Sequence, residues 1–317
     1  MHVGEPIVTR ALVKSPERSY RFSNLFLRPQ DMSLLQLAIL SIIQGITEWL
    51  PISSSGHILL VSAFMGLIGQ DELLINAMAH VGTLFAVLAY FRADVGRAIS
   101  GGFELIGIGR PDASTLSANA KLALLILASL PVALLVGVAF TQMPDAVQAS
   151  LRNLWVVIAA TVIFGLALWW ADTRPVTKKT TGEMTVTQAI LIGATQAIAA
   201  IIPGTSRSGI TMTTARAMGF TRTEAARFSM LIGAPLIAAS GAYAFYELLQ
   251  AEAGTLTLTL QDGLIVIALS AISGYASIAL LMKLLERMSF LPFVAYRLLL
   301  GAALLIASPL ALGLISA

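Results

Sequence analysis

Two polar stretches interrupt the apolar segments of this chain: Pro51-Ile-Ser-Ser-Ser-Gly-His57 and Pro203-Gly-Thr-Ser-Arg-Ser-Gly209. The first separates the apolar segments Leu34–Leu50 and Ile58–Ile68, and the second follows Val186–Ile202. Proline lacks a backbone N–H donor, and serine side chains compete for backbone hydrogen bonds. Neither stretch is therefore compatible with a straight, uninterrupted helix.

The composition around these stretches is typical of a membrane protein. Hydrophobic residues make up 57% of the chain and charged residues 12%, whereas soluble domains usually carry about a quarter charged residues. Several runs approach the roughly 20 apolar residues with which a helix crosses a bilayer. We count six such runs: Ala77–Tyr90, Leu122–Phe140, Leu154–Ala171, Phe228–Leu248, Leu264–Met282 and Leu298–Ile315. An all-α polytopic membrane protein is predicted.

Non-helical backbone at membrane depth requires surrounding protein or a water-filled cavity. Re-entrant helical hairpins over residues 33–69 and 186–226 would satisfy that requirement. The alternative is a pair of surface loops between short helices.

The two polar stretches also match each other. When Gln44 is aligned with Gln196, Pro51 falls on Pro203. The same alignment pairs Ser53 with Thr205, Ser54 with Ser206 and Ser55 with Arg207. Each stretch leads into three apolar runs, so residues 32–180 and 181–317 are predicted to be two repeats. Three crossings per repeat would invert the second relative to the first, as in many transporters. The predicted fold is thus an inverted-topology repeat, each half a re-entrant hairpin plus three transmembrane helices.

Basic residues gather in alternate connections between the apolar runs. The basic connections hold Arg92, Arg97, Arg110 and Lys121; Arg174, Lys178 and Lys179; and Lys283, Arg287 and Arg297. The intervening connections hold Arg152 in one case and no Lys or Arg in the other. The positive-inside rule places the basic connections in the cytoplasm. The first hairpin would then enter from the outer face, the second from the cytoplasmic face, and both termini would lie outside.

Residues 1–31 differ from the remainder of the sequence. They are polar and basic and lack an apolar core segment, so they do not resemble a signal peptide. They are interpreted either as a disordered N-terminal extension or as the result of a misassigned start codon, with translation beginning at Met32. Their positive charge fits an outer location poorly, which favours the second interpretation.

Ionisable side chains within a membrane are costly and usually functional. The first stretch supplies His57 and follows Glu48, which lies one helical turn after Gln44. The second supplies Arg207, whose planar fork suits phosphate oxygens. Hydroxyls and backbone N–H groups at helix N-termini bind the same anions; the nearby hydroxyls belong to Ser206, Ser208 and Thr211. A carboxylate, an imidazole and a guanidinium together match the requirements of phosphoryl transfer.

Each residue also has a structural interpretation when taken alone. Glu48 is equally compatible with a protonated, hydrogen-bonded group, serines with helix caps, and His57 with a capped interfacial histidine. Arg207 is the hardest to explain in this way. For His80 and Asn76 a packing role is predicted, and Arg216, Arg222 and Arg227 are expected to be cytoplasmic-edge charges, one of which could assist phosphate. The chain has no cysteine and three histidines, and its basic residues are scattered, which argues against thiol chemistry, a His-rich metal site and a nucleic-acid partner.

The two motifs resemble those of a known family. Gln44-Gly-Ile-Thr-Glu48 is similar to its (E/Q)xxxE motif, Pro51–His57 follows directly, and Pro203–Thr211 is similar to its PGxSRSGxT motif. This is the BacA-type undecaprenyl-pyrophosphate phosphatase family, linked to bacitracin resistance, and the resemblance extends from Met32 to the C-terminus. It implies an active site open toward the periplasmic side of the bacterial inner membrane, dependence on Mg²⁺ or Ca²⁺, and often a homodimer.

The resemblance also implies roles for individual residues. The catalytic residues would be Glu48, Ser54, His57 and Arg207. The residues that bind the phosphates would be Gln44, Ser53, Ser55, Ser206, Ser208 and Thr211. Glu48 is the candidate metal ligand, and Gln44 leaves the site one carboxylate fewer than in members with Glu at that position.

The predicted activity is hydrolysis of a polyprenyl pyrophosphate, namely undecaprenyl pyrophosphate, to undecaprenyl phosphate and inorganic phosphate, which recycles the carrier for cell-wall synthesis. The lipid tail would remain among membrane lipids. Ser54, His57 or water could be the nucleophile. The alternative is a polyprenyl-phosphate transporter or flippase, because inverted repeats with broken helices also serve alternating access. A second membrane phosphatase family is excluded, since it requires a downstream histidine and none follows His80.

Overall fold

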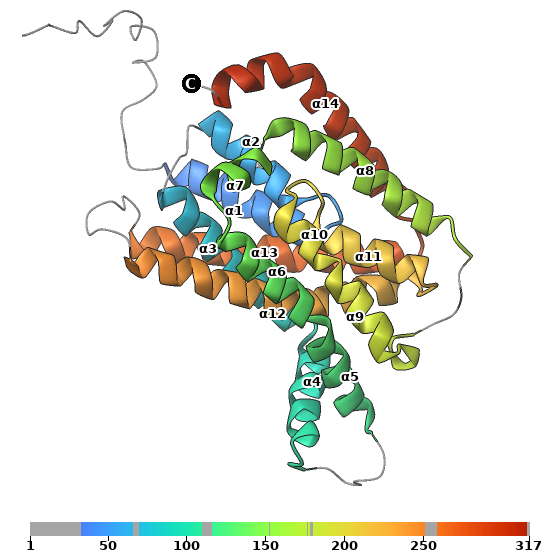
Figure 1. The fold of residues 1–317 in the computed structure, drawn as a ribbon. Coiled ribbons are helices and arrows are strands. Elements are labelled where there is room, and N and C mark those ends of the chain that lie inside the picture. Colours follow the sequence, from blue (N-terminus) through green and yellow to red (C-terminus); the bar gives the residue numbers. More distant parts are fainter. Residues whose placement is uncertain are drawn as a thin grey trace, which may run out of the picture. The chain divides into compact units, whose positions relative to one another are not determined.

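The computed structural model describes residues 33–65, 70–109, 116–151, 153–175, 177, 180–250 and 259–315. The chain divides into the units Met1–Asp31 and Met32–Ala317, and the predictions for residues 1–31 lie outside the described residues. The described part of the second unit is helical throughout (Figure 1). Its α-helices are α1 (Leu34–Trp49), α2 (Ser54–Met65), α3 (Gln70–Tyr90), α4 (Arg92–Leu105), α5 (Ala118–Ser129), α6 (Pro131–Thr141), α7 (Asp145–Leu151), α8 (Leu154–Asp172), α9 (Val186–Ala194), α10 (Gln196–Ile201), α11 (Arg207–Ala217), α12 (Arg222–Gln250), α13 (Leu260–Leu285) and α14 (Leu291–Ile315), with a 3₁₀ turn, η1, at Thr181–Glu183.

Both polar stretches break the chain between helices, as predicted. The first arm, α1, begins with a capping box in which Ser33 and Gln36 each bond the other's backbone N–H. It ends at Trp49, because Leu50 is extended and Pro51 follows. The chain turns at Ser53, which has a φ of 74°, and α2 then begins and packs against α1. Helix–turn–helix geometry of this kind is what a hairpin requires.

The second stretch is built in the same way, with one difference in its first arm. A capping box of Thr185 and Gln188 begins α9, but a break at Thr195 divides the expected single helix into α9 and α10. Gly204 and Ser206 carry the turn with φ values of 90° and 68°, and α11 follows. Both α9 and α10 contact α11, so this segment also doubles back on itself.

Four of the six predicted spans are confirmed among the described residues by length and composition. They are Ala118–Thr141, which joins α5 and α6, Leu154–Asp172, Arg222–Tyr243 and Leu260–Leu285. The first predicted span lies in α3, which together with α4 passes the same test as a pair bent by 88°. The last lies in α14, of which Leu291–Ile306 counts as a shorter apolar helix. The described residues thus hold four candidate spans, or five with the bent pair.

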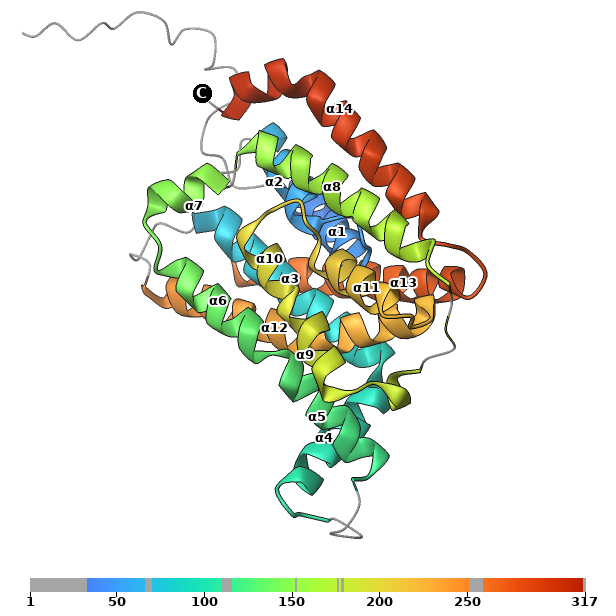
Figure 2. The same ribbon diagram turned by 45° about the vertical axis from the view of Figure 1, so that its right-hand side comes forward.

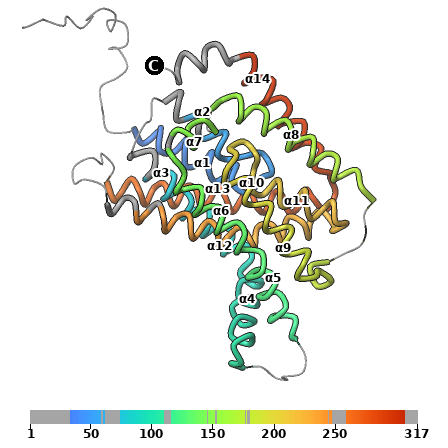
Figure 3. Tube along the Cα trace, viewed as in Figure 1, coloured from blue at the N-terminus to red at the C-terminus, as the bar shows by residue number. Residues whose placement is uncertain are grey.

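Helices from the two ends of the chain interleave. Helix α13 packs along both α1 and α3, and α3 also packs on α12 (Figures 1 and 2). Helices α8 and α14 run side by side (Figure 3). Close approach of α1 and α13 depends on Gly45, where a Cβ would lie 1.9 Å from Ser273 Oγ and 2.8 Å from the Ser270 carbonyl. This packing buries the C-terminal end of α1, where Glu48 lies.

Candidate active site

Glu48 lies at the centre of the cluster formed by the two turns. It is buried one residue before the end of α1, and it accepts hydrogen bonds from three side chains. Gln44 Nε2 donates to Oε2 at 2.9 Å, as the i, i+4 spacing predicts. Ser54 Oγ donates to the same oxygen at 2.6 Å, and Arg207 Nη2 donates to Oε1 at 2.8 Å. One carboxylate therefore joins the first hairpin to the second.

Arg207 is held by contacts on each side of its guanidinium. Nη1 donates to the Gly233 carbonyl of α12 at 2.6 Å, and the guanidinium carbon lies 5.3 Å from the centre of the Trp49 ring. Gly233 leaves the room for this contact, because a Cβ there would lie 2.8 Å from Nη1. Cation–π contact and a charge-assisted pair together compensate the cost of burying the cation. The orientation of Arg207 toward Glu48 is thus set before a ligand arrives.

The two turns end in the same way. Ser53 and Ser206 both have positive φ and directly precede α2 and α11. Ser53 Oγ lies 3.2 Å from Ser55 Oγ, and Ser206 Oγ lies 3.3 Å from Ser208 Oγ. This correspondence shifts the sequence alignment by one residue, because the second turn contains an additional residue. The structural counterpart of Arg207 is therefore Ser54 rather than Ser55, and both are the first residues of their helices.

The shared position explains why both side chains bond Glu48. Each is the first residue of a helix, where the first backbone N–H groups have no partner within the helix. Helix N-termini attract anions through these N–H groups and the helix dipole. The arrangement provides a hydroxyl, a guanidinium and two positive helix ends around one carboxylate. It is suited to an anionic group with several oxygens.

The remaining hydroxyls of the turns bond protein groups. Ser208 Oγ donates to the Leu50 carbonyl at 2.9 Å, and the Gly204 N–H donates to Ser55 Oγ at 3.4 Å, so both tie one turn to the other. Thr211 Oγ1 lies 2.6 Å from Ser229 Oγ, and it is within 3.0 Å of two carbonyls of its own helix. Of the six predicted phosphate-binding residues, Gln44 is the one whose side chain bonds the Glu48 carboxylate among the described residues, and Ser208 Oγ lies 3.5 Å from the Glu48 backbone carbonyl.

Arg297 of α14 forms hydrogen bonds to the backbone of both turns. It is fully buried, and all its hydrogen bonds go to backbone carbonyls. Nη1 donates to Pro51 and Thr205 at 3.3 and 3.0 Å, and Nη2 donates to Gly204 at 2.9 Å. The remaining bonds go to α8, at the carbonyls of Thr161 (2.9 Å) and Ala160 (3.2 Å). The prediction that Arg297 is a loop charge is wrong, because α14 begins at Leu291 and Arg297 lies buried within it.

Comparisons with known proteins identify the family of the chain. The family model described as "Bacitracin resistance protein BacA" matches residues 37–303. The chain belongs to the BacA family. It is 55% identical to the undecaprenyl-diphosphatase of Hyphomonas neptunium over 283 residues, which cover 89% of this chain and 99% of the relative. It is 46% identical to the undecaprenyl-diphosphatase of Maricaulis maris over a region that covers 87% of this chain and 99% of the relative.

In this BacA protein the predicted site residues are not all brought together. Gln44, Glu48, Ser54 and Arg207 form one cluster. His57 instead stacks on Tyr296 and places Nε2 2.6 Å from its hydroxyl, while Nδ1 lies 2.7 Å from the Ser53 carbonyl. No hydrogen bond or ion pair between His57 and Glu48 is present among the described residues.

The histidine that does reach the carboxylate is His80 of α3. Its Nε2 lies 3.9 Å from Glu48 Oε2 and 3.4 Å from Gln44 Nε2. A packing role was predicted for His80, which lies near the start of the first predicted span. Like Glu48, His80 is an ionisable side chain in an apolar run, and this feature could have identified it.

The basic residues after the second hairpin form ion pairs with acidic residues outside the Glu48 cluster. Arg216 and Arg222 pair with Asp172, and Arg227 pairs with Asp94 and Glu224.

The donor set of the cluster fits a hard divalent cation only in part. Within the described residues there is no group of three or more His, Cys, Asp or Glu side chains that could hold a metal. The cluster has one carboxylate, the Gln44 amide and the Ser54 hydroxyl. Mg²⁺ commonly uses one or two carboxylates together with substrate phosphates and water. These residues therefore suit a cation shared with a phosphate ligand rather than one enclosed by protein.

Proposed function

We propose that the cluster of Glu48, Ser54 and Arg207 hydrolyses the terminal phosphoanhydride bond of undecaprenyl diphosphate. The chain is an undecaprenyl-diphosphatase, as its relatives at 41–55% identity over about 87% of the chain are. The observation that carries the assignment of the site is that Ser54 and Arg207, from opposite hairpins, both bond one buried carboxylate. The products are undecaprenyl phosphate and inorganic phosphate.

Binding of the diphosphate would change the contacts of this carboxylate. Phosphate oxygens compete for the fork of Arg207, which binds phosphate bidentately. Glu48 then loses the guanidinium donor and keeps the Ser54 hydroxyl at 2.6 Å. A carboxylate that loses a cationic partner becomes a better proton acceptor. The site would therefore generate its base at the moment when the substrate occupies it.

The chemical step follows from these contacts. Glu48 accepts the Ser54 proton as Oγ attacks the terminal phosphorus, or accepts a proton from a water placed by the same hydroxyl. The bond between the terminal phosphorus and the bridging oxygen breaks, and undecaprenyl phosphate leaves with the electron pair. Arg207 and the N-termini of α2 and α11 stabilise the charge on the phosphoryl oxygens. If Ser54 is the nucleophile, water then cleaves the phosphoserine and releases phosphate.

A divalent cation, Mg²⁺ or Ca²⁺, is part of this proposal. Glu48 and the oxygen of the Gln44 amide would hold it together with the substrate. When bound, it would neutralise phosphate charge and polarise a phosphoryl oxygen. His57 remains a candidate on the basis of its motif; its bond to Tyr296 would have to be exchanged before it could act on phosphate.

An inverted repeat is the architecture that we propose for this site. The first arm of the first hairpin, α1, packs on α13, and the arm α9–α10 of the second packs on α5 and α6. Helices at equivalent positions also pair across the halves, α3 with α12 and α8 with α14. Reciprocal packing of this kind supports a two-fold axis in the membrane plane. With the positive-inside orientation, the site would open toward the periplasm of the inner membrane; a homodimer stays a prediction from the family.

The alternative activity is transport of a polyprenyl phosphate, which the reciprocal packing of the halves would also accommodate. An enzyme releases phosphate in detergent, where no gradient exists, whereas a transporter requires sealed vesicles. The two hypotheses are therefore separated by assaying purified protein in micelles.

The experiment measures phosphate release from undecaprenyl diphosphate by purified protein, with added Mg²⁺ or Ca²⁺ and with chelator. Arg207→Ala is expected to abolish release while the protein stays folded in detergent, although the loss of its bonds to Glu48 and the Gly233 carbonyl should lower its melting temperature. Arg222→Ala is the matched control, because Arg222 bonds Asp172 at the opposite end of the second hairpin. Near-normal release by Arg207→Ala would refute the assignment of the site. No release by the parent with any divalent ion would refute the activity and favour transport.

A further inference from the structure

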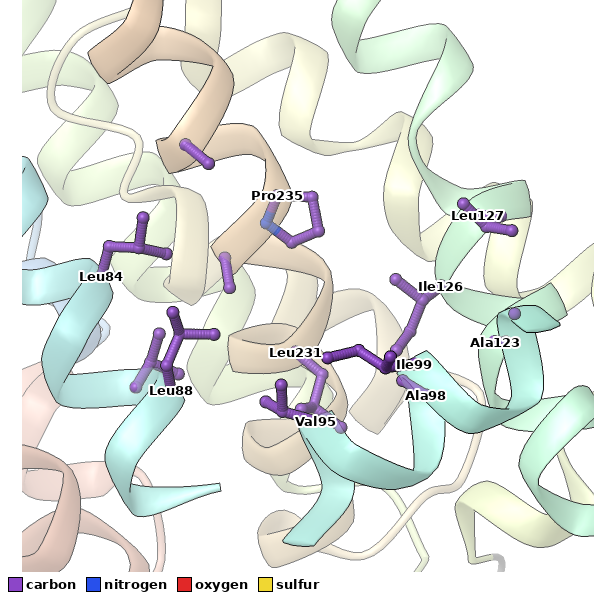
Figure 4. A pocket seen from close by; sticks show the side chains of 14 residues that line it. Leu84, Leu88, Val95, Ala98, Ile99, Ala123, Ile126, Leu127, Leu231 and Pro235 are labelled. Carbon is purple, nitrogen blue, oxygen red and sulfur yellow. The ribbon is translucent and has the colours of Figure 1, made fainter. Parts of the chain in front are cut away.

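Two apolar hollows adjoin each other along α3 and α12. The first, of about 360 Å³, lies between α3, α4, α5 and α12 (Figure 4). The second, of about 240 Å³, lies between α3 and α12. Leu84 and Ala238 line both, so the two hollows form one groove. We call this groove, from Ala77 to Leu88 on α3, the α3–α12 groove.

One end of the α3–α12 groove reaches the active-site cluster. His80 lines the second hollow and is also the histidine whose Nε2 lies 3.9 Å from Glu48. A polar residue of the site is thus part of the wall of an otherwise apolar groove. Further along, Leu231 and Ala234 line the first hollow, and they flank Gly233, whose carbonyl holds Arg207. The site and the groove therefore share the same segments of α3 and α12.

We propose that the α3–α12 groove binds the isoprenoid tail of the substrate while its diphosphate occupies the cluster. This inference rests on the proposed function, because it takes the diphosphate position from the site. A headgroup at Glu48 directs its tail past His80, and the groove continues from there in apolar side chains only. From Ala77 to Leu88 the groove extends about 16 Å along α3, by the helical rise per residue. That length accommodates the first part of a polyprenyl chain and leaves the remainder in lipid.

A second groove on the other side of α1 is the competing location. Its two hollows share Ile46, Leu50 and Phe293, and one of them is lined by His57 and Tyr296. Its walls include the hydroxyls of Thr47, Ser273 and Ser277, and no residue of its walls bonds Glu48 through its side chain among the described residues. The α3–α12 groove has no hydroxyl side chain among the described residues of its walls, and the His80 imidazole in its wall lies 3.9 Å from the Glu48 carboxylate.

The first test enlarges a small residue in each groove. Ala238 and Ala276 are both exposed alanines, the first in the α3–α12 groove and the second in the competing groove. Ala238→Phe is expected to lower kcat/KM for undecaprenyl diphosphate by at least about tenfold. Hydrolysis of dimethylallyl diphosphate should be unchanged, because one prenyl group ends before Leu84, about 6 Å beyond His80 along the helix. Ala276→Phe should change neither rate.

The second test uses the absence of cysteine from the chain. Single Ala238→Cys and Ala276→Cys variants are treated with a thiol reagent in detergent, with undecaprenyl phosphate or with a phospholipid of matched concentration. Protection of Ala238→Cys by undecaprenyl phosphate alone is expected. Protection of Ala276→Cys instead would place the tail in the competing groove, and equal protection by the phospholipid would make the α3–α12 groove an ordinary lipid-facing surface. Either result overturns the inference while phosphate release by the parent still supports the activity.

Discussion

Replacing Arg297 with lysine is expected to destabilise the protein and to separate the two turns of the active site. All five N–H groups of this guanidinium donate to carbonyls, at Thr161, Pro51, Thr205, Ala160 and Gly204. A lysine ammonium has three N–H donors on one atom, so at least two of these buried carbonyls lose their donor. Each buried carbonyl left without a donor costs about 1–3 kcal/mol. The loss of two donors should therefore lower the free energy of unfolding of the variant by about 2–6 kcal/mol.

The assay is thermal unfolding of the purified protein in detergent, together with phosphate release. A loss of this size corresponds to a drop in melting temperature of at least about 5 °C for a chain of this length. Because Arg297 bonds Pro51 on one turn and Gly204 and Thr205 on the other, displacement of the turns should also lower the rate, by about a hundredfold for a shift of about 1 Å.

The matched control is Arg97→Lys. The Arg97 side chain is 50% exposed, and its partner Asp94 keeps a second bond to Arg227. Exposed pairs of this kind contribute about 0–1 kcal/mol, so the control should melt close to the parent. If Arg297→Lys also melts close to the parent and retains full activity, the carbonyl contacts of Arg297 do not hold the turns together.

Three further substitutions test individual contacts. Gly233→Ala should lower phosphate release at least about tenfold, because its Cβ would meet the guanidinium that the Gly233 carbonyl holds. Gly137→Ala in α6, where a Cβ meets nothing within 4 Å, should be fully active, and equal activity of the two would contradict the prediction. Ser54→Ala should lower the rate of phosphate release by at least about a hundredfold. Ser55→Ala removes no bond to the Glu48 carboxylate, so it should lower the rate far less. Equal losses would argue against Ser54 as the reacting hydroxyl. Gln196→Leu should leave the melting temperature unchanged or raise it. The buried Gln196 amide has no hydrogen-bond partner among the described residues, and an unpaired amide costs about 1–3 kcal/mol. A fall of several degrees would mean that this amide is hydrogen-bonded in solution.

The hairpins could be predicted because their determinants are local. Proline, glycine and serine interrupt a helix whatever the rest of the chain does. The capping boxes at Ser33 and Thr185 mark the start of the first arm of each hairpin. The exact correspondence of the two turns could not be predicted. Which residue takes a positive φ depends on how the turn closes, and the additional residue near Gly204 shifts the alignment by one position. The break at Thr195 and the bend between α3 and α4 likewise depend on packing that sequence pattern does not record.

The site was predictable to the extent that its residues lie in the two motifs. Glu48 and Arg207 were identified because a charge in an apolar run requires an explanation, and the structure joins them directly. His80 and Arg297 are also ionisable residues near apolar runs, but they lie in other helices, and no sequence pattern indicates that they meet the turns. Tyr296, which bonds His57, lies outside both motifs. These contacts depend on how α3 and α14 pack against the hairpins, which is a property of the tertiary fold.

In both turns a serine with positive φ precedes a helix, but the two turns differ in chemistry, and this difference would explain how two hairpins form one candidate site. At the shared first helical position, the first turn carries Ser54 and the second carries Arg207. Four residues after the matched glutamines, α1 carries Glu48 whereas α10 carries Ala200, so Gln196 has no carboxylate to bond. A single carboxylate can accept from both turns at once, while a second one would place like charges together at low dielectric. In the proposed site each hairpin therefore supplies what the other lacks, and neither hairpin alone would form a complete site.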